Sequence, residues 1–64
     1  MTNEEKLRRA LPECMITGSK EDNNYQSFLV SGKGFVCIAL VSKTDQKTCY
    51  IHNYNGKLLK TIEI

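Results

Sequence analysis

The sequence predicts an α+β fold in which a short N-terminal helix packs on a four-stranded antiparallel β-meander. Three observations support this prediction. A capping motif and an apolar stripe occupy residues 2–11, strand-like runs fill residues 25–64, and glycine or asparagine separates several of those runs. Residues 18–24 are all polar or glycine, so we expect a loop between the two parts. The chain of 64 residues is therefore expected to form a single domain.

The helix is expected over residues 2–11. Thr2 and Glu5 have the Thr-x-x-Glu spacing of a capping box, and acidic residues in a first turn complement the helix dipole. Pro12 disfavours helical geometry at the residue before it, so the helix should end there. A helix this short is not stable alone and must pack against the sheet. Three apolar residues at helical spacing form the packing stripe: Leu7, Ala10 and Leu11.

Four runs rich in β-branched and aromatic residues are expected to be strands, at residues 25–31, 35–43, 48–54 and 58–64. Gly32 suits the first central position of a type II′ turn, and Asn55-Gly56 is the strongest hairpin signal in the chain. A polar loop is expected over residues 44–47. Residues 14–17 are either a fifth, short edge strand or an extended connector.

Side chains alternate along a strand, so the lengths of these turns decide which residues share a face. With two-residue turns at Gly32-Lys33 and Asn55-Gly56 and a four-residue loop at 44–47, the helix covers an aliphatic core. This core is expected to contain Leu29, Val36, Ile38, Leu40, Cys49, Ile51, Leu58, Ile62 and Ile64. The opposite face then collects Phe28, Val30, Phe35, Cys37, Ala39, Val41, Tyr50, His52, Tyr54 and Leu59.

The second of these faces is unusual, because the outward face of an antiparallel sheet is ordinarily polar. Contiguous exposed apolar surface commonly marks an interaction site. We therefore expect a small stand-alone protein-interaction module, such as an inhibitor, adaptor or accessory subunit, that binds a larger protein or a second copy of itself. Aromatic residues dominate interface hot spots, so the expected anchors are Phe28, Phe35, Tyr50, His52 and Tyr54.

Two structural alternatives would cover or dilute this aromatic face. The sheet could curl into a small barrel whose second side is closed by Met15 and Ile16. Alternatively, one turn could be longer by a residue, which would exchange the faces of every strand that follows it.

Binding of single-stranded nucleic acid is the alternative function. Aromatic side chains on an open sheet can stack on bases while nearby lysines follow the phosphates. The turns of the predicted sheet supply four such lysines: Lys33, Lys43, Lys47 and Lys57. The net charge of +2 is too small by itself to indicate a nucleic-acid partner.

We expect no enzyme activity, no metal and no cofactor. A chain of this size buries only about 60% of its unfolded surface, which is too little to wrap a deep cleft. The sequence contains no glycine-rich phosphate-binding motif and no Cys-x-x-Cys. Cys49 and His52 are three residues apart on a predicted strand, so their side chains should point to opposite faces. Cys37 shares a predicted face with His52 but has no third group to orient the pair.

The expected location is cytoplasmic, without membrane association. The longest apolar run, residues 35–41, is far shorter than the roughly 20 residues that span a bilayer. Residues 1–6 are polar and do not match a secretory signal. The three cysteines are an odd and small number for a disulfide scaffold, so we expect reduced thiols.

Overall fold

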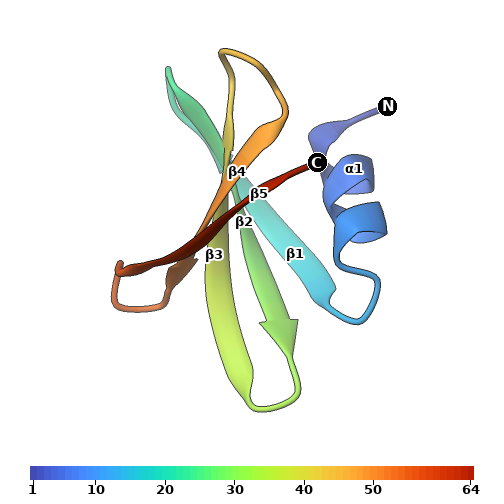
Figure 1. Cartoon of the computed structure of the whole chain (residues 1–64), viewed down its shortest axis with the longest axis vertical. Helices are drawn as coiled ribbons and strands as arrows, with labels where there is room; N and C mark the ends of the chain where they lie inside the picture. Colours follow the sequence, from blue (N-terminus) through green and yellow to red (C-terminus); the bar gives the residue numbers. More distant parts are fainter.

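The computed structural model describes all 64 residues as one short helix and five antiparallel strands in one open sheet (Figure 1). The elements are α1 (Asn3–Ala10), β1 (Met15–Glu21), β2 (Tyr25–Gly32), β3 (Phe35–Ser42), β4 (Thr48–Asn53) and β5 (Leu58–Glu63). The strands lie side by side in chain order, so the sheet is a meander whose edges are β1 and β5. The predicted helix and antiparallel meander are confirmed, and the fifth strand that the sequence left open at residues 14–17 is present as β1.

The helix α1 begins at the predicted capping box. The Thr2 hydroxyl oxygen accepts the backbone N–H of Glu5 at 3.2 Å, and the Glu5 carboxylate accepts the backbone N–H of Thr2 at 3.0 Å. Leu7 is the buried residue of the helix. The Arg8 guanidinium donates to the carbonyl oxygen of Ile16 in β1 at 3.1 Å. Leu7 and this hydrogen bond fasten the helix to the edge strand, and Asn3 Nδ2 donates a further hydrogen bond to Gln26 Oε1 in β2 at 3.0 Å.

Strand β1 continues through residues that were predicted to be a loop. Residues 18–21 extend the strand, so only residues 22–24 remain as the turn before β2. This polar segment is compatible with an edge strand because every β1 side chain except Ile16 is exposed. Gly18 forms a bulge in the pairing with β2, and its φ of +62° is one that glycine adopts without steric cost.

The β2–β3 hairpin turns one residue later than predicted. Gly32 pairs with Phe35, so the two central residues are Lys33 and Gly34, with a φ of +76° at Gly34. Val30 consequently pairs with Cys37 instead of Phe35. A shift of two positions moves the pairing along the strands but leaves each side chain on its predicted face.

The β3–β4 loop is one residue longer than predicted. Leu40 pairs with Tyr50, whereas a four-residue loop would have placed Leu40 opposite Ile51. The loop therefore contains the five residues 43–47, and Gln46 in it has a φ of +56°. It is the one residue other than glycine with a positive φ.

This extra residue exchanges the two faces of β4, as the second structural alternative described. Cys49 and Ile51 are buried in the core, and Tyr50 and His52 point to the opposite side. The predicted arrangement of these four residues relative to β3 is wrong for that reason. The pairing of Cys49 with Ile62 in β5 is as predicted.

The β4–β5 hairpin turns at the predicted Asn55-Gly56, through residues 54–56. The backbone N–H of Asn53 donates to the carbonyl oxygen of Lys57 at 2.8 Å, and Gly56 has a φ of +94°. A bulge at Leu59 follows, because Ile51 pairs with Lys60 and the next residue of β4 pairs with Leu58. The turn has one residue more than predicted, and the bulge adds one unpaired residue to β5. The two changes cancel, so Cys49 keeps its predicted pairing with Ile62.

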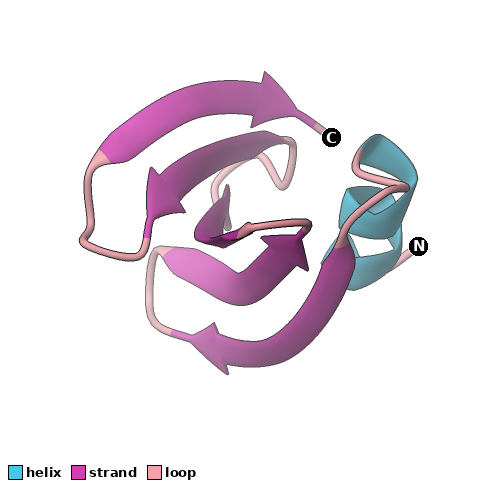
Figure 2. Ribbon diagram, turned by 90° about the horizontal axis from the view of Figure 1, so that it is seen from below, coloured by secondary structure: helices cyan, strands magenta, loops and turns pink.

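The core lies inside the curled sheet, and α1 lies at its open side beside β1 and the end of β5 (Figures 1 and 2). The core consists of nine buried side chains: Leu7, Ile16, Phe28, Val30, Cys37, Ala39, Val41, Cys49 and Ile51. In β2 and β3 it therefore uses the face that was predicted to bind a partner, and the predicted core of Leu29, Val36, Ile38 and Leu40 is wrong. The burial of Ile16 agrees with the curled-sheet alternative, although the sheet stays open.

Candidate interaction surfaces

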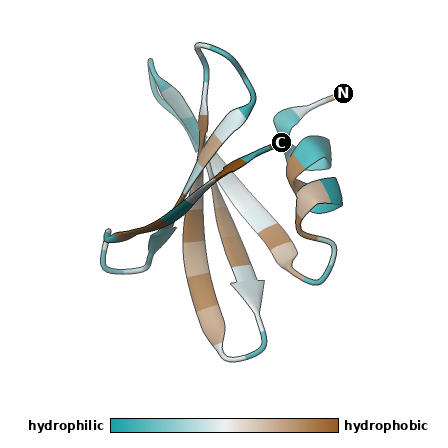
Figure 3. Cartoon of the chain, viewed as in Figure 1, coloured by the Kyte–Doolittle hydropathy of each residue, from teal (hydrophilic) through white to brown (hydrophobic).

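The side of the sheet that points away from α1 and the core, here called the outer face, is rich in apolar side chains. Cross-strand pairing joins Leu29 to Ile38, Ile38 to His52, and His52 to Leu58. These four residues form one row across β2, β3, β4 and β5. Val36, next along β3, is 44% exposed, and Leu58 is 50% exposed. The brown segments of β3 in Figure 3 show how continuous the apolar sequence of this strand is.

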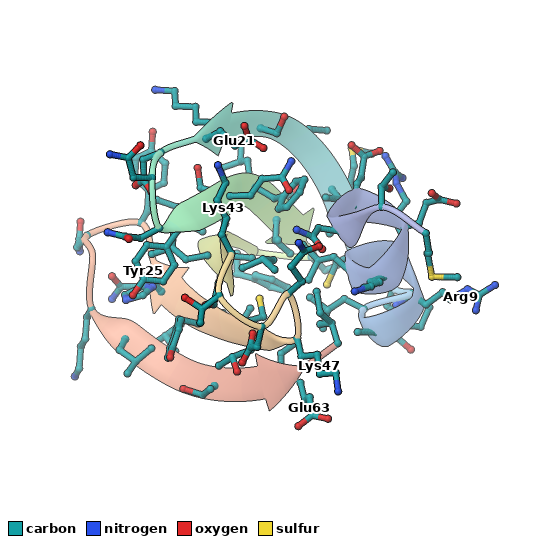
Figure 4. All side chains as sticks on the ribbon, turned by 90° about the horizontal axis from the view of Figure 1, so that it is seen from above. Arg9, Glu21, Tyr25, Lys43, Lys47 and Glu63 are labelled. Atoms are coloured by element: carbon teal, nitrogen blue, oxygen red, sulfur yellow. The ribbon has the colours of Figure 1, made fainter.

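Two tyrosines lie beside this row. Tyr50 is paired with Leu40 on the outer face. Its ring contacts the ring of Tyr25 edge to face, with ring centroids 6.0 Å apart and an angle of 83° between the planes. Figure 4 shows Tyr25 at the end of the sheet where the β1–β2 and β3–β4 connections lie. This geometry is the one that aromatic pairs prefer, so it orders the upper part of the outer face.

A shallow groove of about 380 Å³ crosses the lower part of the outer face. Its floor includes Leu29 and Ile38, one side is formed by residues 18–20 around the β1 bulge, and the other by the ring of Tyr54. Tyr54 is 71% exposed, so this ring is the most solvent-accessible large apolar group in the chain. The groove can receive a side chain from a partner between the bulge and the ring.

His52 occupies the centre of the apolar row. Its Nδ1 atom is buried and has no hydrogen-bond partner in the chain. A buried polar atom without a partner costs free energy. His52 is the one polar residue in an otherwise apolar row.

The five predicted anchors do not form one surface. Phe28 is 2% exposed and belongs to the core. Phe35, at the start of β3, is on the same side of the sheet but at its end, where it is 45% exposed. Tyr50, His52 and Tyr54 are on the outer face. The structure thus brings three of the five together and separates the two phenylalanines from them.

Sequence reasoning missed the aliphatic members of the outer face, namely Leu29, Val36, Ile38, Leu40 and Leu58, because it assigned them to the core. A five-residue β3–β4 loop would have placed the β3 members of this set on the face of Tyr50 and His52 instead of on the face of the buried Cys49 and Ile51. The signal for that loop was present in Asp45, whose carboxylate accepts the backbone N–H groups of Lys47 and Thr48 at 2.9 and 3.0 Å. Such contacts are typical of tight turns that begin with Asp.

The four predicted nucleic-acid-binding lysines are distributed over three connections of the sheet. Lys33 is in the β2–β3 turn and Lys57 in the β4–β5 turn, whereas Lys43 and Lys47 are in the β3–β4 loop (Figure 1). Lys43 lies against Glu21, with 3.5 Å between its Nζ and the carboxylate (Figure 4). The lysines therefore do not line a single track along which a phosphate backbone could run.

A second apolar surface, here called the core groove, opens beyond the C-terminal end of α1. It has a volume of about 330 Å³. Its lining residues are Leu11, Cys14, Val30, Phe35, Cys37, Ile51, Leu59 and Lys60. Three of these, Val30, Cys37 and Ile51, are members of the buried core, so the groove leads directly to it.

All three cysteines are free thiols. Cys37 and Cys49 are buried, and burial raises the pKa of the Cys49 thiol to about 11. A thiol with a raised pKa is a poor nucleophile, because the thiolate is the reactive form. No three His, Cys, Asp or Glu side chains are grouped so that they could hold a metal ion. The chain has no helix long and apolar enough to cross a bilayer.

Comparison with known protein families, curated proteins and solved structures found no match to this chain.

Proposed function

We propose that this chain is a small protein-interaction module that docks on a larger protein through its outer face. The observation that supports the proposal is the row of Leu29, Ile38, His52 and Leu58 across four adjacent strands, which no element of the chain covers. When one face of an antiparallel sheet covers the core and the other contacts water, the side chains on the water-exposed face are ordinarily polar. Burial of this row against a partner stabilises the complex by about 25 cal/mol for each Å² of apolar surface removed from water.

Both edges of the sheet favour docking by the face over addition of a strand. The edge strand β1 contains a bulge at Gly18, and the edge strand β5 contains one at Leu59. Charged residues are also present on each edge, at Lys20 and at Lys60. Bulges and charges are the features by which native sheets discourage edge-to-edge pairing.

In this proposal the chain acts by occupying a surface of its partner, as an inhibitor, an adaptor or an accessory subunit does. Tyr50, His52 and Tyr54 are the proposed anchors, with the exposed aliphatic side chains of the outer face around them. The module needs no cofactor and performs no catalysis. We further propose that it works in the cytoplasm, where the three thiols stay reduced.

The test compares three tagged forms of the chain in affinity capture from cells that express it. The first is the wild type. The second carries Val36→Lys and Leu58→Lys, which place one charge beside the apolar row and one in it. The third carries Asn23→Lys and Thr44→Lys, which add the same charge at exposed loop positions away from the row. Circular dichroism establishes that all three are folded.

We expect at least one protein to be captured by the wild type and by the loop variant but not by the outer-face variant. Capture of the same proteins by all three forms would contradict the proposal. The nucleic-acid alternative is tested in parallel with a fluorescent single-stranded oligonucleotide. Binding that weakens steeply with salt and is lost when Lys33 and Lys57 are replaced would favour that alternative.

A further inference from the structure

The helix α1 is too short to cover the whole core side of the sheet. Its eight residues span about 12 Å. The seven residues of β1 span about 23 Å, and the six of β5 about 20 Å. The helix covers the half near the β3–β4 loop, where Lys6 donates to the carbonyl oxygen of Gln46 at 3.0 Å. The core groove lies in the uncovered half.

The core groove has one charged group, the ammonium of Lys60. This residue pairs with the buried Ile51, so its side chain leaves β5 on the core side of the sheet. Neither of the two ion pairs of the chain includes Lys60, and no carboxylate lines the groove. Glu13 lines an adjoining hollow instead, together with Lys33. The groove therefore presents a single unpaired cation beside apolar side chains.

The strand pairing shows how long the core groove is. Ile51 pairs with Ala39 as well as with Lys60, so the lysine lies at the level of Ala39. Phe35 lines the groove four residues away along β3, and four residues of a strand span about 13 Å. The ring of Phe35 also lines the adjoining hollow, so it separates the two spaces. The groove thus runs from a cation at one end to an aromatic ring at the other.

Both dimensions of the groove fit a short alkyl chain. An extended chain of single bonds rises about 1.2 Å per bond, so about 13 Å holds roughly ten carbons. The groove volume of about 330 Å³ holds roughly eleven groups of about 30 Å³, the share of one water molecule and nearly that of a methylene. We propose that the core groove binds the anion of a medium-chain saturated fatty acid, with its carboxylate at Lys60 and its methyl end at Phe35.

The distribution of polar groups selects this ligand over a peptide. A peptide segment in the groove would lose water from its own amide groups, and no side-chain oxygen or amide lines the groove to replace that water. The bulge at Leu59 interrupts the edge of β5 along which such a segment would pair. An alkyl chain has no amide groups, and its one carboxylate has Lys60 as a partner. The groove is on the opposite side of the sheet from the outer face, so this inference goes beyond the proposed function and does not depend on it.

Isothermal titration calorimetry with hexanoate, octanoate, decanoate and dodecanoate tests the proposal, each acid being kept below the concentration at which it forms micelles. We expect one site per chain. The affinity should rise about two- to fourfold for each added methylene, because each one removes further apolar surface from water. The rise should stop near ten carbons, where the alkyl chain reaches Phe35. In ¹⁵N NMR spectra, decanoate should shift the signals of Val30, Cys37 and Ile51 and leave those of the outer face unchanged.

Substitutions at the two ends of the groove make the test specific. Lys60→Gln should weaken decanoate binding about two- to fivefold and Lys60→Glu about tenfold, with the binding of uncharged decanol unchanged within about twofold. Lys57→Gln, in the β4–β5 turn, is the matched control and should leave decanoate binding unchanged. Phe35→Ala removes the closing ring, so the affinity should continue to rise from decanoate to dodecanoate. All three residues are exposed, and circular dichroism checks the fold.

Three results would overturn the proposal at this groove. The first is the absence of saturable binding with all four acids. The second is an equal loss of affinity with Lys60→Gln and Lys57→Gln, or NMR shifts confined to the outer face. The third is a shift of the groove signals that follows protein concentration instead of decanoate, which would assign the groove to a second copy of the chain. The capture experiment does not involve the groove, so its result is independent of these.

Discussion

The Asp45 carboxylate binds Thr48 through two hydrogen bonds and thereby sets where β4 begins. Its Oδ2 accepts the Thr48 hydroxyl at 2.6 Å, and its Oδ1 accepts the backbone N–H of Thr48 at 3.0 Å. The loop closed by these contacts has five residues, and an odd count is what turns Tyr50 and His52 to the outer face. An exposed carboxylate thus decides which side chains of β4 are available to a partner.

The first prediction concerns the acid stability of this loop. The hydrogen bonds from Thr48 and from the backbone hold the pKa of the Asp45 carboxyl at about 2, below its ordinary value of 3.8. A carboxyl with a lowered pKa stabilises the fold fully above its unfolded value, and this contribution is lost as the pH falls towards 2. We expect Asp45→Ala to lower the thermal midpoint at pH 7 and to flatten its dependence on pH between about 4 and 2.

Asp45→Asn is the matched control for this prediction. The amide oxygen can still accept the two backbone N–H groups, so part of the stability at neutral pH should remain, but the position no longer titrates. Hydrogen bonds also lower the pKa of Glu5 and of Asp22, so the wild type has other acid-sensitive groups. The informative quantity is therefore the difference in thermal midpoint between the wild type and Asp45→Asn. If this difference does not change with pH, the role of Asp45 is refuted.

The second prediction concerns Gln46, the next residue in the loop. Its φ of +56° lies in the left-handed region, which costs a residue with a Cβ roughly 1 kcal/mol relative to glycine. Gln46→Gly should therefore raise the free energy of unfolding by about 0.5–1 kcal/mol, as measured in urea. Thr44 in the same loop has no positive φ, so Thr44→Gly relieves no strain and should lower the free energy of unfolding. Equal losses for both variants would show that the conformation of Gln46 is not strained.

The elements of this fold were largely predictable, because their signals are local. The capping box at Thr2 predicts the start of α1, and Asn55-Gly56 predicts the last hairpin. Residues 18–21 could not be assigned in the same way. Their side chains are polar because they lie at an edge, and their strand geometry comes from the backbone of β2, which is not visible in their own sequence.

The surfaces were less predictable than the elements, because a face depends on loop length to a single residue. Ile38 and Phe28 are both apolar residues in strands, and their sequence neighbourhoods do not distinguish the outer face from the core. The sheet curls around Phe28, and Leu7 docks on the same side of the sheet. These two features decide that Phe28 is in the core and Ile38 is on the outer face. These are long-range packing effects, and they outweighed the aromatic pattern from which the interaction face was predicted.

The third prediction separates the two phenylalanines. Phe28 is buried among core side chains, so Phe28→Leu should lower the free energy of unfolding by about 1–2 kcal/mol through lost burial and a residual cavity. Phe35 is nearly half exposed, so Phe35→Leu should change it by less than about 0.5 kcal/mol. Urea unfolding at low protein concentration measures both values without a contribution from association. Similar decreases in the free energy of unfolding for the two variants would show that Phe35 contributes to the core as much as Phe28 does.

The fourth prediction compares two neighbours in β4 whose polar groups differ in their hydrogen bonding. The buried Nδ1 of His52 has no partner in the chain, so His52→Phe removes an unsatisfied polar atom and should raise the free energy of unfolding by up to about 1 kcal/mol. The Asn53 side-chain oxygen, in contrast, accepts backbone N–H groups of Asn55 and Lys57, both at 2.9 Å. Asn53→Leu should therefore lower the free energy of unfolding by about 1–2 kcal/mol. A gain in stability would show that the fold of the isolated chain does not require His52, as expected of a residue that serves as a contact on the outer face. A loss of stability with His52→Phe as large as that with Asn53→Leu would remove this support for His52 as an anchor.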